Sequence, residues 1–366
     1  MTVDSQTSTR TGQYPKDSAD EQSRVSQRLR LAIGRIRLAR YSGVLLLIGF
    51  IVFFSVRLPN TFPTQATVTS IAGDQSITLV LALGLLVALA VGQFDLSAAQ
   101  NLGMSAVVCS KLMTSGHLSP GLAVLMTLLV GLFIGLANAV LVVVIGVESL
   151  IATLGMSSVL LALTELFSNY QFVGPVPNGF QDFANKEVFG FPVVAGYALV
   201  LSLVVWYVLE HTPVGRRAFA VGANPDASRL AGVRTGRYVA GSLVATSLLA
   251  AIAGVLVSAK IGSVAPTLGP AYLLPSFAAC FLATTQIKPG RFNVWGTVVA
   301  LVLLATGVKG LQLMGANLWV TDMFNGLALT AAVSAAVLSN KRAPRRKKLR
   351  RATPASVARS HRDGSH

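Results

Sequence analysis

Long runs of apolar residues, separated by short segments rich in polar residues, Gly or Pro, repeat along most of the chain. A helix that crosses a bilayer needs roughly 20 apolar residues, within a range of about 17–25. The pattern therefore predicts an all-α, polytopic integral membrane protein with about ten transmembrane helices. The predicted spans are 41–57, 68–91, 95–113, 121–146, 149–169, 193–210, 237–258, 271–286, 294–313 and 318–339.

Three of these ranges are atypical for membrane spans. The range 41–57 is short, 95–113 holds several polar residues, and 271–286 contains Pro275. Eight or nine true spans therefore also fit the pattern. Gly131, Gly135 and Ala139 recur at four-residue spacing, which favours close packing of helix backbones in lipid.

The composition supports a membrane protein. Of 366 residues, 53% are hydrophobic and 12% are charged, whereas a soluble domain carries about 25% charged residues. The net charge of +16 is concentrated at the ends, since residues 1–40 hold eight Lys/Arg and 341–362 hold ten of the thirty. We expect a disordered basic cytoplasmic tail over 1–40, a permease domain over 41–339 and a second basic cytoplasmic tail over 340–366. No nucleic-acid module accompanies this charge.

Basic residues also predict the orientation, because Lys and Arg accumulate in cytoplasmic loops. With ten spans and the N-terminus inside, both basic tails lie inside, while an odd number of spans leaves one of them outside. Seven loop cations then lie inside and five outside. The inside set is Arg216, Arg217, Arg229, Arg234, Arg237, Lys288 and Arg291, and the outside set is Arg57, Lys111, Lys186, Lys260 and Lys309.

The chain carries no recognisable catalytic motif. It lacks a zinc-protease helix, a phosphate-binding Gly-Lys-Ser/Thr loop and a serine elbow. Cys109 and Cys280 stand alone in apolar runs and are expected to be small buried residues. The sequence therefore predicts no catalytic residue, no metal site and no cofactor, and the protein is not expected to be an enzyme.

Five carboxylates lie close to the ends of predicted spans: Asp74, Asp95, Glu148, Glu165 and Asp322. Asp95 is the most informative, because Gly92-Gln-Phe-Asp-Leu-Ser97 interrupts two apolar stretches. Two interpretations are open. Asp95 can cap the following helix by accepting its free N–H groups. Alternatively, the segment is a broken helix near a transport path, since interrupted helices at membrane depth occur only where they line protein or a cavity.

A polar, arginine-bearing segment, residues 212–235, separates two apolar spans in the second half of the chain. Asn224 suits a helix N-cap, Pro225 the first helical position and Asp226 the positive end of the helix dipole. Gly232 can end the helix in a left-handed conformation. The predicted helix runs from about Pro225 to Ala231, and it must dock onto something, because two turns are unstable alone.

These residues resemble the permease subunits of bacterial ABC importers of the ribose-type sugar and branched-chain amino acid permease family. The family's cytoplasmic loop is matched by Gly215-Arg216, Ala220, Gly222, Asn224, Ala227 and Ala231-Gly232-Val233. Further matches, in order over about 60–338, are Gly92 with Asp95-Leu96-Ser97, Ile151-Ala-Thr-Leu-Gly-Met156, Ala278-Ala279 and Gly296-Thr297. The chain departs from the family at Leu273-Leu274-Pro275, Ala283-Thr284-Thr285, Lys309-Gly310 and Ala162-Leu163.

The resemblance implies a coupling helix that contacts a separate ATPase subunit. The ATPase-coupling residues that it implies are Arg216, Gly222, Asn224, Asp226, Ala227, Arg229, Leu230 and Gly232. Candidates for the translocation path are Gly92, Asp95, Ser97 and Thr153. It further implies ABC ATPase subunits at the cytoplasmic face, an extracytoplasmic substrate-binding protein, and a homodimer or a paired permease in the bacterial inner membrane.

We therefore expect a permease that moves a small polar solute, most readily a monosaccharide or related sugar. Branched-chain amino acids are the alternative cargo within the same family. A secondary transporter driven by an ion gradient is a rival, although such proteins need buried carboxylates or an unwound ion site near the midplane. A membrane scaffold or receptor without transport is a second rival. The departures from the family pattern leave the cargo open.

Overall fold

The computed structural model describes residues 41–317 and 319–342, and it places a helix at every predicted span. The predicted tails lie outside the described residues, apart from 340–342, which still belong to the last helix. The helices at the predicted spans are α2 (Ser42–Arg57), α3 (Gln65–Ala90), α4 (Ala98–Thr114), α5 (Pro120–Ala139), α6 (Ser149–Ser168), α8 (Val193–His211), α11 (Thr235–Ile261), α12 (Leu273–Ala283), α13 (Val294–Leu313) and α14 (Trp319–Arg342).

Within residues 41–317 and 319–342, six helical segments are long and apolar enough to cross a membrane. They are α3, the segment Pro120–Val144, α6, α8, α11 and α13. The segment Pro120–Val144 joins α5 to a π-helical turn, η1 (Val140–Val144). α2 and the segment Gly269–Ala283, which joins the 3-10 turn η2 (Gly269–Tyr272) to α12, are shorter apolar helices. The described chain is therefore a helical, polytopic membrane protein.

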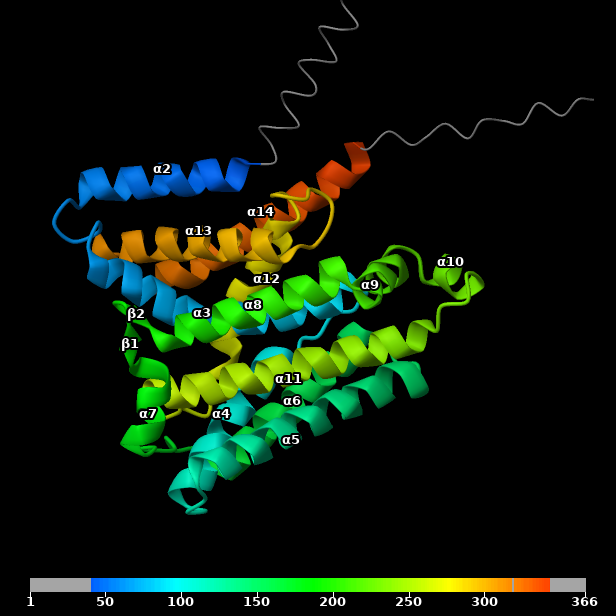
Figure 1. The fold of residues 1–366 in the computed structure, drawn as a ribbon, viewed down its shortest axis with the longest axis horizontal. Helices are drawn as coiled ribbons and strands as arrows, with labels where there is room; N and C mark the ends of the chain where they lie inside the picture. The colour runs from blue at the N-terminus through cyan, green and yellow to red at the C-terminus, as the bar shows by residue number, and fades with distance from the viewer. Residues whose placement is uncertain (1–40, 318, 343–366) are drawn as a thin grey trace, which may run out of the picture.

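The connectors between these helices gather at two opposite ends of the bundle (Figure 1). One end carries α9 (Pro213–Ala223) and α10 (Pro225–Leu230). The other carries α7 (Asn178–Asn185) and the antiparallel pair β1 (Glu187–Val188) and β2 (Phe191–Pro192). The first residues of α2 and the last of α14 point toward the end with α9 and α10.

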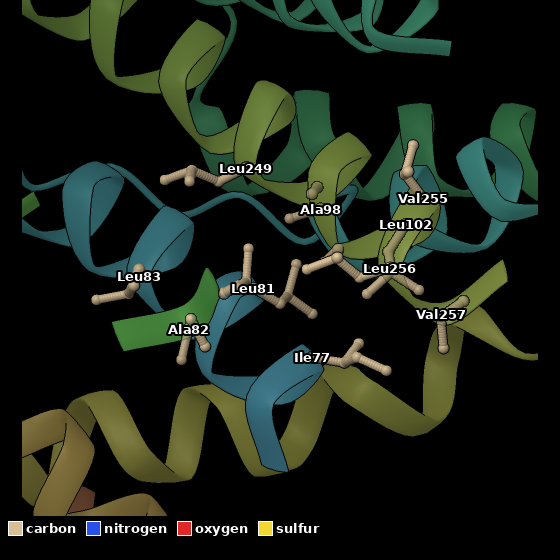
Figure 2. Packing of buried hydrophobic residues seen from close by; sticks show 14 of the residues in the cluster. Ile77, Leu81, Ala82, Leu83, Ala98, Leu102, Leu249, Val255, Leu256 and Val257 are labelled. Carbon is tan, nitrogen blue, oxygen red and sulfur yellow. The ribbon is translucent and has the colours of Figure 1, made fainter. Parts of the chain in front are cut away.

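The central helix of the bundle is α11, which packs along α3, α4 and α5. Its apolar side chains meet those of α3 and α4 in one buried cluster, as Figure 2 shows for Leu256 with Leu81 and Leu102. Leu81 and Leu102 have no exposed surface. α11 thus holds the first and second halves of the chain together.

Small residues set the distance between α11 and its neighbours. A Cβ added at Gly254 would lie 2.5 Å from the carbonyl oxygen of Leu102, and one at Gly131 would lie 2.4 Å from the Cβ of Ala251. Both distances are too short for a real contact, so only glycine permits this approach. The packing role predicted for Gly131 is therefore confirmed, and it follows the general use of small residues between helices in lipid.

We expect the substitution Gly254→Leu to destabilise the bundle, because the added side chain must displace the backbone of α4. Overpacking of this kind costs about 1–3 kcal/mol, which thermal unfolding of the detergent-solubilised protein can detect. Gly241→Leu is the matched control, since Gly241 is exposed on the same helix and a Cβ there meets nothing within 4 Å. Equal unfolding midpoints for the two variants would contradict this account.

Candidate functional site

The predicted short helix in the segment 212–235 is present as α10, and its ends have the expected chemistry. Asn224 is extended at the N-cap position, and its Oδ1 accepts a hydrogen bond from the backbone N–H of Ala227 at 2.9 Å. Pro225 occupies the first turn together with Asp226. Gly232 has a φ of +80°, the left-handed conformation predicted for the helix end.

α10 projects from the bundle (Figure 1), and most of its residues are exposed. Asp226, Ala227 and Arg229 are exposed, and Leu230 is 91% exposed, while Ser228 is buried toward the protein. A six-residue helix with an exposed leucine gains little from its own bundle. Its surface is therefore free to receive a partner.

α9 rests directly on the end of α3. A Cβ at Gly222 would lie only 2.4 Å from the carbonyl oxygen of Ala90, so the two backbones touch. Gly92, which has a φ of +81°, also lies next to Gly222, since a Cβ added at Gly92 would lie 3.4 Å from the Cα of Gly222. Val91 packs with apolar residues of α9 in a small buried cluster. The segment with α9 and α10 is therefore joined to the point where α3 stops.

The backbone between α3 and α4 leaves the helical hydrogen-bond pattern, and side chains of α6 replace the missing partners. The N–H of Phe94 donates to the Oγ of Ser149 at 3.2 Å. The N–H of Leu96 donates to the Oγ1 of Thr153 at 3.0 Å. Interrupted backbone within a membrane protein requires such internal partners, so α6 holds the break in place.

Asp95 lies at the centre of this break and has no exposed surface. Its Oδ1 accepts hydrogen bonds from the backbone N–H of Ser97 at 3.0 Å and from the Ser97 hydroxyl at 2.6 Å. The Nδ2 of Asn138, on α5, donates to the Oγ of Ser97 at 2.8 Å. Ser97 is the N-cap residue of α4. Asp95 therefore accepts the N–H of the residue that precedes the helix, which is close to the capping role predicted for it.

The structure thus brings together three of the four path candidates, Asp95, Ser97 and Thr153, in one buried network. Each has no exposed surface. In this conformation they bind one another and the backbone instead of lining an open cavity, whereas Gly92 is exposed at the contact with α9. The sequence did not predict the partners Ser149 and Asn138. The one feature that could have indicated them is a polar side chain at the end of, or within, an apolar span.

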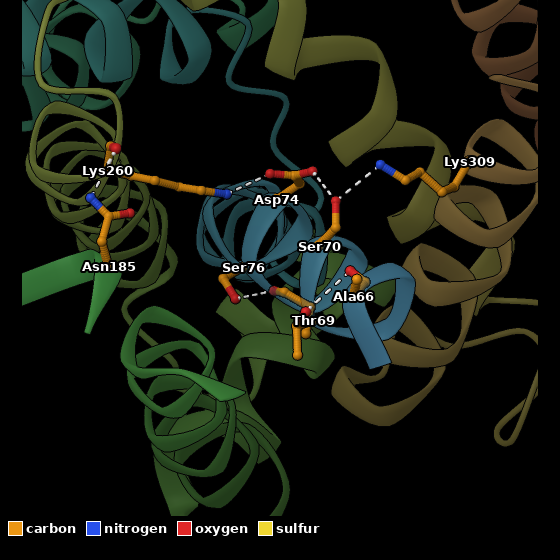
Figure 3. A network of polar contacts seen from close by, with 9 residues as sticks. Ala66, Thr69, Ser70, Asp74, Ser76, Asn185, Lys260 and Lys309 are labelled. Carbon is orange, nitrogen blue, oxygen red and sulfur yellow. Dashed lines mark hydrogen bonds and ion pairs between the residues drawn. The ribbon is translucent and has the colours of Figure 1, made fainter. Parts of the chain in front are cut away.

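A second polar cluster lies at the opposite end of α3 (Figure 3). The carboxylate of Asp74 pairs with the Nζ of Lys260 at 2.6 Å and accepts a hydrogen bond from the hydroxyl of Ser70 at 3.2 Å. The Nζ of Lys309 donates to the Oγ of Ser70 at 3.0 Å. The carbonyl oxygen of Lys260 also accepts from Asn185 of α7. This cluster therefore ties α3, α11 and α13 together near the end that carries α7.

A cavity of about 370 Å³ opens beside the Asp74–Lys260 pair. Its walls come from α3, α11, α13, α14 and the η2–α12 segment, and it mixes apolar with polar side chains. The polar lining is Asp74, Gln75, Thr78, Lys260, Tyr272, Thr321, Asp322 and Asn325. Two of the carboxylates singled out in the sequence thus border one cavity. Among the described residues, no group of three or more His, Cys, Asp or Glu could hold a metal ion.

We expect Thr153→Val to destabilise the break, because it leaves the partly buried N–H of Leu96 without its acceptor. An unsatisfied buried donor costs about 1–3 kcal/mol. Thermal unfolding should therefore show a lower midpoint for Thr153→Val than for Thr153→Ser, which keeps the hydroxyl. Ser158→Ala, which removes an exposed hydroxyl from the same helix, should behave as the wild type. A Thr153→Val protein as stable as the wild type would show that the hydrogen bond is dispensable.

Comparison with known proteins agrees with this geometry. Residues 67–333 match the family model described as branched-chain amino acid transport system / permease component. The autoinducer 2 import system permease protein LsrD of Escherichia coli (strain K12) is 32% identical over 260 residues, which cover 69% of this chain and 78% of the relative. LsrD proteins of Shigella flexneri and Escherichia coli O157:H7 match to the same extent.

No solved structure gives a significant match. The family match spans most of the helical bundle and includes both α10 and the break at Asp95. The resemblance seen in the motifs is therefore confirmed. The chain belongs to the branched-chain amino acid transport system permease family, and it is a multi-pass protein of the inner membrane and the permease subunit of an importer.

Proposed function

We propose that this permease forms the translocation path of an ATP-driven importer, and that a small polar solute, most readily a monosaccharide or related sugar, is its cargo. The observation that carries the proposal is the exposed, capped helix α10, joined through α9 to the buried helix break at Asp95. Such a helix offers a docking surface to a separate ATPase subunit. The permease itself needs no nucleotide site.

In this proposal the bundle crosses the membrane ten times, with both termini in the cytoplasm. The first residues of α2, the last of α14 and the helices α9 and α10 lie toward one end of the bundle, which supports an even number of crossings (Figure 1). The excess of Lys and Arg in the connectors at that end supports a cytoplasmic position. Residues 41–339 then form the permease domain, flanked by basic cytoplasmic tails.

The topology can be tested by cysteine labelling in intact cells. A cysteine at the exposed position of Arg229 should react with a membrane-impermeant maleimide only after the cells are opened. A cysteine at Gln171, exposed between α6 and α7, should react in intact cells once the reagent can enter the periplasm. Cys109 and Cys280 are buried and should stay unlabelled. Labelling of Arg229→Cys in intact cells would overturn the orientation.

We propose that ABC ATPase subunits bind at α10 and that an extracytoplasmic substrate-binding protein docks at the opposite end. The contact residues would be Asp226, Ala227, Arg229 and Leu230, which are exposed. The helix ends are fixed by Asn224 and Gly232, while Gly222 and Arg216 belong to α9. A homodimer, or a pair with a similar permease, would complete the path.

The proposed coupling runs from α10 through α9 into the bundle. Movement of the ATPases displaces α9, and Gly222 transmits this displacement to the carbonyl end of α3, because no side chain separates the two backbones. The break 91–97 then moves with α3, and its hydrogen bonds to Ser149 and Thr153 carry the movement into α6. Opening of the network would expose Asp95 and Ser97 to the path. Nucleotide binding to the ATPases would thereby shift the equilibrium between two conformations of the bundle.

The substitution Ala227→Trp should separate the permease from its ATPase. Ala227 is exposed, so a bulky side chain there leaves the fold intact but obstructs docking. We expect loss of ATPase co-purification and of ATP-dependent uptake, at an unchanged unfolding midpoint. Gln171→Trp, at the opposite end, is the control and should retain the ATPase. Normal uptake and co-purification in Ala227→Trp would exclude α10 as the coupling helix.

The cargo can be identified through the partner proteins. The relatives LsrD are named for import of autoinducer 2, while the family description names branched-chain amino acids. Purification of the native complex should yield an ATPase and a binding protein. The latter should then be tested by calorimetry against monosaccharides, autoinducer 2, leucine, isoleucine and valine. Binding of a sugar or autoinducer 2 supports the proposal, whereas binding of the amino acids alone supports the alternative cargo. Uptake that survives ATP depletion but stops with an uncoupler would indicate a secondary transporter.

A further inference from the structure

We propose that a groove at the start of α11 binds the phosphate headgroup of an anionic phospholipid. The groove has a volume of about 600 Å³ and lies between the end of η1 and the junction of α10 with α11. Three arginines line it, Arg229, Arg234 and Arg237, together with Val143 and small residues of 232–240. The proposal rests on the cytoplasmic position of this end.

The charge in the groove has a single sign. Its lining contains no Asp or Glu, and all three arginines are exposed. The ion pairs found among the described residues are Lys260–Asp74 and Lys288–Glu210. The three guanidinium groups therefore have no carboxylate partner in the part of the chain that the structure describes, and they leave an unneutralised positive site.

Two of the arginines are arranged to act together. Arg234 precedes the first residue of α11, and the N–H of Arg237 donates to the carbonyl oxygen of Arg234 at 3.0 Å. Both arginines line the groove. Arginine offers several N–H donors in a planar fork, which suits the oxygens of a phosphate. The start of α11 thus presents paired donors to one ligand.

The other wall of the groove is apolar and belongs to a membrane span. Val143 lies in the last turn of the span Pro120–Val144. Its neighbours Val144 and Ile145 are 76% and 64% exposed. A Cβ at Gly236 would lie 3.0 Å from Cγ1 of Val143, so the arginine-bearing turn packs closely against this apolar end. The groove therefore sits where a lipid-facing surface meets positive charge.

This combination favours a phospholipid over an acidic protein surface. A phospholipid places a phosphate and acyl chains at the same membrane level, and both have a counterpart here. Anionic lipids attract cytoplasmic basic residues with about 1 kcal/mol per Lys or Arg near the surface. An acidic patch on the ATPase would use the arginines but not the apolar wall at Val143. The lipid is therefore the proposed ligand, and a role of the arginines in ATPase binding alone is the contrary result of the test.

The experiment uses the purified full-length permease and dioleoylphosphatidylglycerol, with dioleoylphosphatidylcholine as the neutral probe. Native mass spectrometry would measure the apparent Kd for each lipid. We expect the double variant Arg234→Gln/Arg237→Gln to weaken phosphatidylglycerol binding by more than ten-fold, since about 1 kcal/mol per arginine corresponds to about five-fold each. Binding of phosphatidylcholine should not change.

Two control variants make the result specific. Arg216→Gln/Arg217→Gln removes the same charge from α9, outside the groove, and should bind phosphatidylglycerol as the wild type does. Arg234→Lys/Arg237→Lys keeps the charge but loses the planar fork, so it should bind phosphatidylglycerol more tightly than the Gln variant and more weakly than the wild type. An equal loss in the α9 variant, or no loss in the groove variant, would overturn the proposal. So would a groove variant that binds lipid normally but no longer co-purifies with the ATPase.

A failure of the proposed function is distinguishable from a failure of this site. If cysteine labelling places Arg229 outside the cell, the topology fails and the lipid site fails with it. If the topology holds and no ATPase binds at α10, the lipid measurement still stands, because it uses the permease alone.

Discussion

The backbone between α3 and α4 leaves the helical pattern inside a membrane bundle, where water does not satisfy free N–H groups. The rest of the candidate site depends on how this need is met. Hydroxyls of Ser149 and Thr153 accept the N–H groups of Phe94 and Leu96, and Asp95 accepts that of Ser97. α6 therefore fixes the break, and the carboxylate of Asp95 also stabilises its irregular backbone.

The two ion pairs found among the described residues lie toward opposite ends of the bundle. Asp74 and Lys260 pair near one end, and at the other Glu210, in the last turn of α8, pairs with Lys288 of the α12–α13 connector. Glycines such as Gly254 let α11 touch α4 along its backbone. Apolar contacts fill much of the interior, but polar side chains such as Asn101, Thr246 and Ser258 are also buried there. α10 is exposed at one end of the bundle, and the cavity beside Asp74 lies near the other.

The sequence predicted the helices and α10 well, because their signals are local. Apolar length predicts a span, and the cap at Asn224 with a left-handed Gly232 depends on neighbours within the same turn. The sequence did not predict the network around Asp95, since Phe94 and Ser149 are 55 residues apart and Ser97 and Asn138 are 41 apart. Nor did it predict the contact of Gly222 with Ala90. Such pairs depend on how helices pack, which apolar periodicity does not specify.

The contact between Gly222 and the carbonyl oxygen of Ala90 has a mechanical consequence. Most contacts between helices are made by side chains, which can change rotamer and so absorb small movements of one helix against another. Here the main chains of α9 and α3 meet directly, and this joint contains no side chain that could rearrange. With no side chain between them, little is available at this joint to absorb a small displacement of α9 before it reaches α3. Under the proposed function, enlarging Gly222 would therefore change the geometry of the joint itself and not merely its surface.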